Sequence, residues 1–340
     1  MPLVRPPQRP PRTCVPRGAA WATAALAAAS VAACVRAPVA RPAARLLAHE
    51  GHLAGAGGTR LFYRVMGDAP DTVVVVHGGP GAGMNALRPD LQPLARTHTV
   101  VFYDQRGGGR SELPADTAQL SADAHAADLE AVRAHFGLRT MSVVAHAFGA
   151  LVVARYAETH AERLRRVVFV DAVGPRRAAD ADSGAVPADS ATRERLTALR
   201  RELAEGSAAD PVNSCREVEA IVRTAAVAHG PRWRGSSCEM PAPAVAYYFR
   251  HTARRGPASL GDWDFTASLA HVRAPLLVVH GADDADALAA QRAWAAALPD
   301  ARLLLVPRAG RGAPAERPDL VFPAIDAFLA GRWPAGARAP

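Results

Sequence analysis

Short apolar runs separated by longer amphipathic segments make up most of the chain from residue 59 onward. Apolar runs of about four to eight residues, rich in Val, are typical of strands buried on both faces of a sheet. Residues 121–136 predict a helix, with Ser121 as its N-cap. Strands that alternate with helices indicate an α/β fold with a mostly parallel central sheet flanked by helices. The predicted strands are residues 59–65, 72–77, 98–103, 141–146, 166–170, 276–280 and 301–306.

The strand pattern stops between residues 174 and 263, where only helical patterns occur. A helical insert between two sheet-forming halves predicts a cap domain, which we place at residues 176–262 before the last strands. The core is then expected to consist of residues 50–175 and 263–332. The predicted cap helices are residues 190–203, 216–228 and 243–251.

The N-terminal residues have the pattern of an export signal. A basic, proline-rich stretch precedes an apolar run over residues 18–33, which is followed by Cys34. The run is short for a membrane span, which needs about 20 apolar residues. The small residues before Cys34 predict a bacterial lipoprotein signal over residues 1–33, with a lipid on Cys34 as membrane anchor and a linker over residues 34–49. An ordinary signal peptide or an uncleaved anchor remains the alternative.

Charge and composition exclude some partners. The net charge is +8, yet every basic residue is an arginine, and no basic run is interleaved with aromatic residues. We therefore expect no nucleic-acid binding. No group of potential metal ligands stands out in the sequence, and we expect no cofactor. The sequence makes no prediction of the oligomeric state.

Two cysteines remain for pairing in an exported chain. Cys14 would be lost with the signal and Cys34 would carry the lipid. An oxidising compartment would then allow a disulfide between Cys215 and Cys238. The alternative is that both are small apolar side chains with no bond between them.

Four glycine-rich motifs follow predicted strands in a fixed order. Together, over about residues 50–332, they resemble the proline iminopeptidases and their α/β-hydrolase relatives. The resemblance implies an α/β-hydrolase fold and acyl transfer by a serine nucleophile, a histidine base and an orienting acid. Taken as structure alone, the motifs could be no more than tight loops. They are the loop of His77, Gly78, Gly79, Pro80 and Gly81; the loop that begins with Asp104, Gln105, Arg106 and Gly107; the strand–turn–helix of residues 143–156; and the turn of residues 280–284.

The resemblance places Ala147 where the family has its nucleophile. A methyl group carries neither a lone pair nor a transferable proton, so covalent catalysis is impossible there. His146 is adjacent, but the turn is expected to direct its side chain elsewhere. Ser142 lies five residues too early and Ser111 lies in another loop, so neither is a convincing substitute.

The other triad positions are Asp284 and Arg311. Asp284 matches the family's acid, with Asp283 as the neighbouring alternative, and Arg311 stands where the family has its histidine. Arginine stays protonated at physiological pH and cannot act as a general base. Arg311 would instead pair with Asp284. The family's oxyanion hole maps to the backbone N–H groups of Gly79 and Phe148.

These substitutions predict an exported pseudohydrolase without catalytic activity. We expect it to bind a small anionic or peptide-like ligand in the cleft that holds the active site in the family. One alternative is an active serine-type hydrolase or aminopeptidase that uses an unrecognised arrangement. Another is a structural or decaying copy whose cleft has no function.

Overall fold

The computed structural model describes residues 48–177, 189–226 and 233–340. The predicted signal, the predicted lipidation site Cys34 and nearly all of the predicted linker lie outside these residues. Within the described ranges, no helix is long and apolar enough to cross a bilayer.

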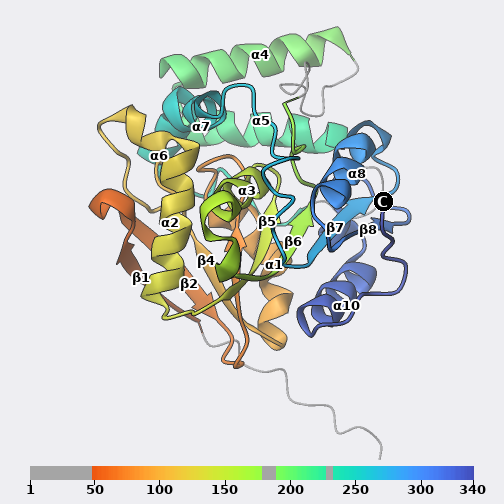
Figure 1. Cartoon of the computed structure of the whole chain (residues 1–340). Coiled ribbons are helices and arrows are strands. Elements are labelled where there is room, and N and C mark those ends of the chain that lie inside the picture. The colour runs from red at the N-terminus through yellow and green to blue at the C-terminus, as the bar shows by residue number, and fades with distance from the viewer. Residues whose placement is uncertain (1–47, 178–188, 227–232) are drawn as a thin grey trace, which may run out of the picture. The chain divides into compact units, whose positions relative to one another are not determined.

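An eight-stranded sheet forms the centre of the described chain (Figure 1). Its strand order is β1-β2-β4-β3-β5-β6-β7-β8. Strand β2 pairs antiparallel with both β1 and β4, and the remaining neighbours are parallel. This confirms the predicted α/β class with a mostly parallel sheet. The strands are β1 (Ala48–Ala54), β2 (Arg60–Met66), β3 (Thr72–Val76), β4 (Thr99–Tyr103), β5 (Met141–His146), β6 (Leu164–Val170), β7 (Leu276–Gly281) and β8 (Ala301–Val306).

Helices cover both faces of the sheet, and the alternation of side chains along β3 shows how. Val74 and Val76 pack in one hydrophobic cluster with Leu151. Val73 and Val75 pack in a second cluster on the other face. Because successive side chains of a strand point to opposite faces, a continuous valine run requires cover on both sides. The helices outside the cap are α1 (Arg88–Leu91), α2 (Ala122–His135), α3 (Gly149–His160), α8 (Leu288–Ala297), α9 (Ala313–Glu316) and α10 (Pro318–Leu329).

The described residues between β6 and β7 form helices but no strand, and these helices pack around their own apolar cluster. Leu196, Leu199 and Leu203 of α4 meet Val218 of α5 and Val245 of α6 there. Figure 1 shows α4 and α5 side by side beyond one end of the sheet. We propose on this basis that residues 176–262 act as a separate cap. The helices are α4 (Ser190–Glu205), α5 (Pro211–Ala226), α6 (Ala242–Tyr247) and α7 (Ala253–Ser259).

Several boundaries differ from the prediction, and three of these differences have a clear structural reason. Strand β1 begins at Ala48, inside the expected linker of residues 34–49, and pairs with β2 over its whole length. Helix α5 begins at Pro211 rather than at residue 216, because Asp210 accepts a hydrogen bond from the N–H of Asn213 (3.0 Å) and caps it. The chain also remains part of the core beyond residue 332, since Arg338 forms an isolated bridge with Leu303 of β8.

Candidate functional site

The turn between β5 and α3 has the backbone shape that holds a nucleophile in hydrolases. Ala147 occupies it with a φ of 48°, in the left-handed region that non-glycine residues rarely adopt. Its carbonyl oxygen accepts a hydrogen bond from the N–H of Val173 (3.2 Å). Gly149 allows α3 to approach β3, because an added Cβ there would lie 2.4 Å from the carbonyl oxygen of Val76. The strained turn is thus retained around a methyl group.

The glycine-rich loop after β3 lies directly against this turn. A Cβ added at Gly78 would lie 3.0 Å from the Cβ of Ala147. Phe148 caps the N-terminus of α3, where the first amides have no partner within the helix. The structure therefore places the predicted oxyanion donors, Gly79 and Phe148, in two adjoining segments.

His77 holds the loop in place and is itself buried. The N–H of Gln105 donates to Nε2 of His77 (3.1 Å), so the ring proton is on Nδ1, which donates to the carbonyl oxygen of Gly78 (2.7 Å). Gln105 Nε2 donates in turn to the carbonyl oxygen of His77 (2.7 Å), and its Oε1 accepts from Gly81 (3.1 Å). Burial lowers the pKa of His77 to about 4. His77 and Gln105 are positioning residues that join the two motif loops.

The second motif loop contributes buried contacts to the core. Arg106 binds both carboxylate oxygens of Asp128 on α2, each at 2.6 Å. Asp104 accepts hydrogen bonds from the N–H groups of Met84 (2.6 Å) and Arg110 (2.8 Å), and burial raises its pKa to about 6. Gly107 adopts a φ of 75° and contacts Thr252, whose hydroxyl donates to the Gly107 carbonyl (2.7 Å). The loop thus joins β4, α2 and the segment between α6 and α7.

Neither serine considered as a substitute nucleophile is available. Ser142 is buried within β5. Ser111 is also buried, and its hydroxyl donates to the carbonyl oxygen of Asp104 (2.6 Å) while accepting from the N–H of Phe62 (2.8 Å). Both side chains are therefore enclosed by the core and are not exposed to a substrate.

The acid position and the histidine position form an ion pair. Arg311 Nε lies 2.8 Å from Asp284 Oδ2, and Nη2 lies 3.2 Å from Oδ1. Burial opposes the charge on Arg311, but the hydrogen bond and charge of Asp284 raise its pKa overall. Glu316 fixes the loop by accepting from the N–H groups of Gly310 and Gly312, both at 3.1 Å. A permanently protonated side chain therefore lies at the position where the resemblance predicts the general base.

A buried His–Asp pair beneath this ion pair was not anticipated from the sequence. Nδ1 of His280 lies 2.7 Å from Oδ1 of Asp171, and its Nε2 lies 3.5 Å from Oδ2 of Asp284. Burial alone would lower the pKa of His280, but the hydrogen bond and charge of Asp171 raise it. Burial also raises the pKa of Asp171 to about 6. His280 belongs to a motif, but no sequence pattern links it to Asp171, which directly follows the end of β6.

A tryptophan from the helical insert lies over the nucleophile turn and was also missed. The ring centres of Trp233 and His146 are 5.2 Å apart, with an angle of 66° between the ring planes. A Cβ added at Gly312 would lie 3.2 Å from Trp233 Nε1, so the indole also borders the loop of Arg311. Burial lowers the pKa of His146 to about 4, which leaves its ring neutral near pH 7. Trp233 thus lies between the nucleophile position and the histidine position.

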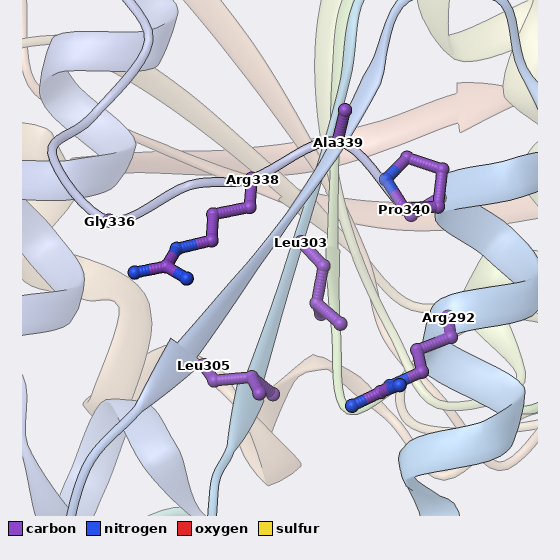
Figure 2. A pocket seen from close by; sticks show the side chains of 8 residues that line it. Arg292, Leu303, Leu305, Gly336, Arg338, Ala339 and Pro340 are labelled. Carbon is purple, nitrogen blue, oxygen red and sulfur yellow. The ribbon is translucent and has the colours of Figure 1, made fainter.

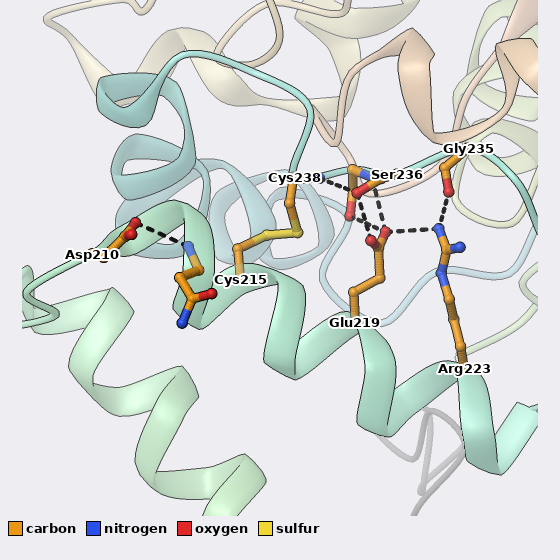
Figure 3. The surroundings of a disulfide bond; sticks show 9 residues. Asp210, Cys215, Glu219, Arg223, Gly235, Ser236 and Cys238 are labelled. Carbon is orange, nitrogen blue, oxygen red and sulfur yellow. Dashed lines mark hydrogen bonds and ion pairs between the residues drawn. A yellow bond between two sulfur atoms is a disulfide. The ribbon is translucent and has the colours of Figure 1, made fainter.

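The segment that carries Trp233 is fastened to α5 (Figure 3). Cys215 and Cys238 form a disulfide. Glu219 accepts hydrogen bonds from Ser236 (2.6 Å) and from the N–H of Ser237 (2.8 Å). Arg223, one turn further along α5, donates to the carbonyl oxygen of Trp233 (2.6 Å). These contacts fix the position of the indole relative to α5.

Comparison with known proteins agrees with this architecture. The profile of a family described as alpha/beta hydrolase fold matches residues 71–212. A non-heme haloperoxidase from Rhodococcus erythropolis is 28% identical over 68% of this chain and 81% of its own. A proline iminopeptidase from Lactobacillus helveticus is 25% identical over 67% of this chain and 79% of its own. The crystal structure of a proline iminopeptidase from Mycobacterium smegmatis superposes with a TM-score of 0.59 at 20% identity, covering 83% of this chain and 98% of that one. The chain is therefore an α/β-hydrolase-fold protein.

Proposed function

We propose that this chain is a non-catalytic pseudohydrolase that binds a small anionic or peptide-like ligand at the site formed by Ala147, Trp233 and Arg311. The observation that carries the proposal is the two-point ion pair between Arg311 and Asp284. It puts a group that cannot accept a proton where the histidine base belongs, while Ala147 removes the nucleophile. Asp284, the predicted acid, is paired with Arg311, so it does not orient a histidine base.

Several hydrogen-bond donors suited to a ligand do not depend on an intact triad. Arginine has five N–H donors, and the ion pair uses only Nε and one hydrogen of Nη2. The Arg311 side chain is 31% exposed, so the remaining donors can be reached from solvent. Backbone N–H groups of Gly79 and Phe148 are independent of side-chain replacement. The relatives named proline iminopeptidases suggest a peptide-like ligand in particular.

Ligand-induced stabilisation tests this proposal. We would measure the melting temperature of the wild type with a panel of short peptides and small carboxylates, because a ligand that binds only the folded state raises stability by mass action. Arg311→Gln should abolish the stabilisation. Arg273→Gln removes an exposed arginine elsewhere and should leave it unchanged. Stabilisation that survives in Arg311→Gln, or no stabilisation by any member of the panel, would oppose the proposal.

The second candidate is an active serine-type hydrolase with an unrecognised arrangement, which the hydrolase names among the relatives favour. Labelling with a serine-directed fluorophosphonate separates it from a pseudohydrolase. We expect no labelling of the wild type. A labelled serine, located by peptide mass spectrometry, would support the second candidate and identify its nucleophile.

We also propose that the protein is exported and anchored in the membrane by a lipid on Cys34. The support is the basic leader, the apolar run of residues 18–33 and the small residues before the cysteine. Mass spectrometry of the membrane fraction should detect a lipid-modified N-terminal peptide that begins at Cys34. A mature peptide in which Ala33 and Cys34 are still joined, without lipid, would rule this out.

A further inference from the structure

A pocket of about 540 Å³ lies between α8, the edge strand β8 and the C-terminal segment (Figure 2), and none of its lining residues belongs to the site described above. Its volume is within the roughly 300–1,000 Å³ typical of small-molecule sites. Ala295 of α8 and Leu303 and Leu305 of β8 form an apolar part of its lining. A cavity of this size with an apolar lining favours a hydrocarbon group over a polar solute.

Two arginines give this pocket its charge. Arg292 of α8 and Arg338 of the C-terminal segment both line it. In Figure 2 the side chains of Leu303 and Leu305 lie between the two arginines, and the guanidinium of Arg292 points toward Leu305. Among the described residues, neither guanidinium has a hydrogen-bond or ion-pair partner. The pocket therefore combines an apolar surface with two guanidinium groups that form no ion pair within the described residues.

The wall that contains Arg338 is fixed by the backbone. The N–H of Leu303 donates to the carbonyl oxygen of Arg338 (2.8 Å), and the N–H of Arg338 donates back to Leu303 (3.0 Å). The guanidinium of Arg302 lies 4.5 Å from the centre of the Trp333 ring, which holds the start of the segment against β8. These contacts satisfy backbone groups of an edge strand and place Arg338 beside the leucines.

We propose that this pocket binds an unbranched fatty acid in its carboxylate form. Its alkyl chain would lie on Leu303, Leu305 and Ala295, and its carboxylate would accept hydrogen bonds from Arg292 or Arg338. Guanidinium groups suit carboxylates because they donate two parallel hydrogen bonds. An inorganic anion would leave the apolar surface unused, and a neutral lipid would leave both charges unpaired.

Isothermal titration calorimetry with dodecanoate tests the proposal. We expect saturable binding of one molecule, and about a ten-fold loss of affinity in Arg292→Gln or in Arg338→Gln, whichever removes the charge-assisted hydrogen bonds to the carboxylate. The matched control is Arg332→Gln, an exposed arginine outside the pocket lining, which should bind as the wild type does. Leu305→Glu, which places a negative charge in the pocket, should abolish binding.

Further outcomes would overturn the proposal. Equal affinity of the two pocket arginine variants and the wild type would show that the carboxylate is not recognised there. Equal affinity for dodecanol would show that the alkyl group of the ligand alone drives binding. Preference for phosphatidylglycerol vesicles over dodecanoate, lost in the same variants, would indicate a membrane contact instead. Arg311→Gln should leave dodecanoate binding intact, which separates this pocket from the site of Arg311.

Discussion

Under the proposed function, residue 147 lacks the nucleophile but keeps the backbone conformation of its turn. A left-handed conformation destabilises a non-glycine residue by about 1–2 kcal/mol. The turn nevertheless persists at a φ of 48°, because the ends of β5 and α3 on either side are set by packing against β3. The shape of the turn is thus set by the packing of the fold and does not require an oxygen atom at residue 147.

Replacement of Ala147 by glycine tests the strain at this turn. Glycine relieves the strain but gives the unfolded chain more freedom, and the two effects nearly cancel. We expect Ala147→Gly to change the free energy of unfolding by less than about 0.5 kcal/mol in urea titrations. The matched control, Ala154→Gly in the middle of α3, should lower it by about 1 kcal/mol. Equal losses in both variants would contradict the interpretation.

His125 on α2 is a second residue whose surroundings make a clear prediction. It is fully buried, and neither ring nitrogen has a hydrogen-bond partner within the described residues. Burial lowers its pKa to about 3. The unfolded chain, with a histidine pKa near 6.5, therefore takes up a proton more readily than the folded one. The contribution of His125 to stability must fall as the pH drops below about 6.5.

We expect His125→Leu to raise the free energy of unfolding by about 1 kcal/mol at pH 7, because it removes two unsatisfied polar atoms. The gain should grow by about 1.4 kcal/mol for each pH unit below 6.5, down to the folded pKa. Urea midpoints at pH 7.5 and pH 5 measure both quantities. A gain that does not increase at pH 5 would mean that His125 is charged or hydrated in the folded protein.

At the scale of elements, the segment that carries Trp233 depends on α5. The disulfide joins residues 23 apart in sequence, and Glu219 and Arg223 add hydrogen bonds from the same helix. Asp90 contributes from the core side, where its carboxylate accepts from the N–H groups of Arg234 and Gly235, each at 2.9 Å. The disulfide therefore stabilises the position of the Trp233 segment relative to α5.

Loss of the disulfide should lower stability by about 3 kcal/mol, the loop-closure value for a loop of this size. The variant Cys215→Ala with Cys238→Ala tests this in urea titrations. Adding a reductant should destabilise the wild type to a similar degree and leave the double variant unchanged. If the reductant destabilises both proteins equally, or neither, the disulfide does not contribute as inferred.

The elements also show which parts of the fold the sequence could predict. Strands β5 and β8 have the predicted bounds because continuous apolar runs mark them clearly. Strand β1 was missed because it lies at the edge of the sheet, and only Leu53 among its residues is buried. At the site, motif order located Asp284 and Arg311. Contacts such as Trp233 with His146 join distant segments and leave no local pattern.

At the scale of the whole molecule, the sheet still assembles the parts of a hydrolase site. The nucleophile turn follows β5, the glycine-rich loop follows β3, and the acid follows β7. The proposed loss of catalysis rests on two residues: Ala147 carries no oxygen nucleophile, and Arg311 cannot accept a proton. These losses affect two different segments, so restoring either one alone leaves the other step impossible.

The most direct test is hydrolysis of one short-chain nitrophenyl ester by four proteins: the wild type, Ala147→Ser, Arg311→His and the double variant. Without a triad, such sites retain only about a 10³–10⁴-fold advantage over water. We predict turnover near background for the wild type and both single variants, and a measurable increase only in the double variant. Wild-type turnover as fast as that of an ordinary esterase, abolished by Asp284→Asn, would contradict the account.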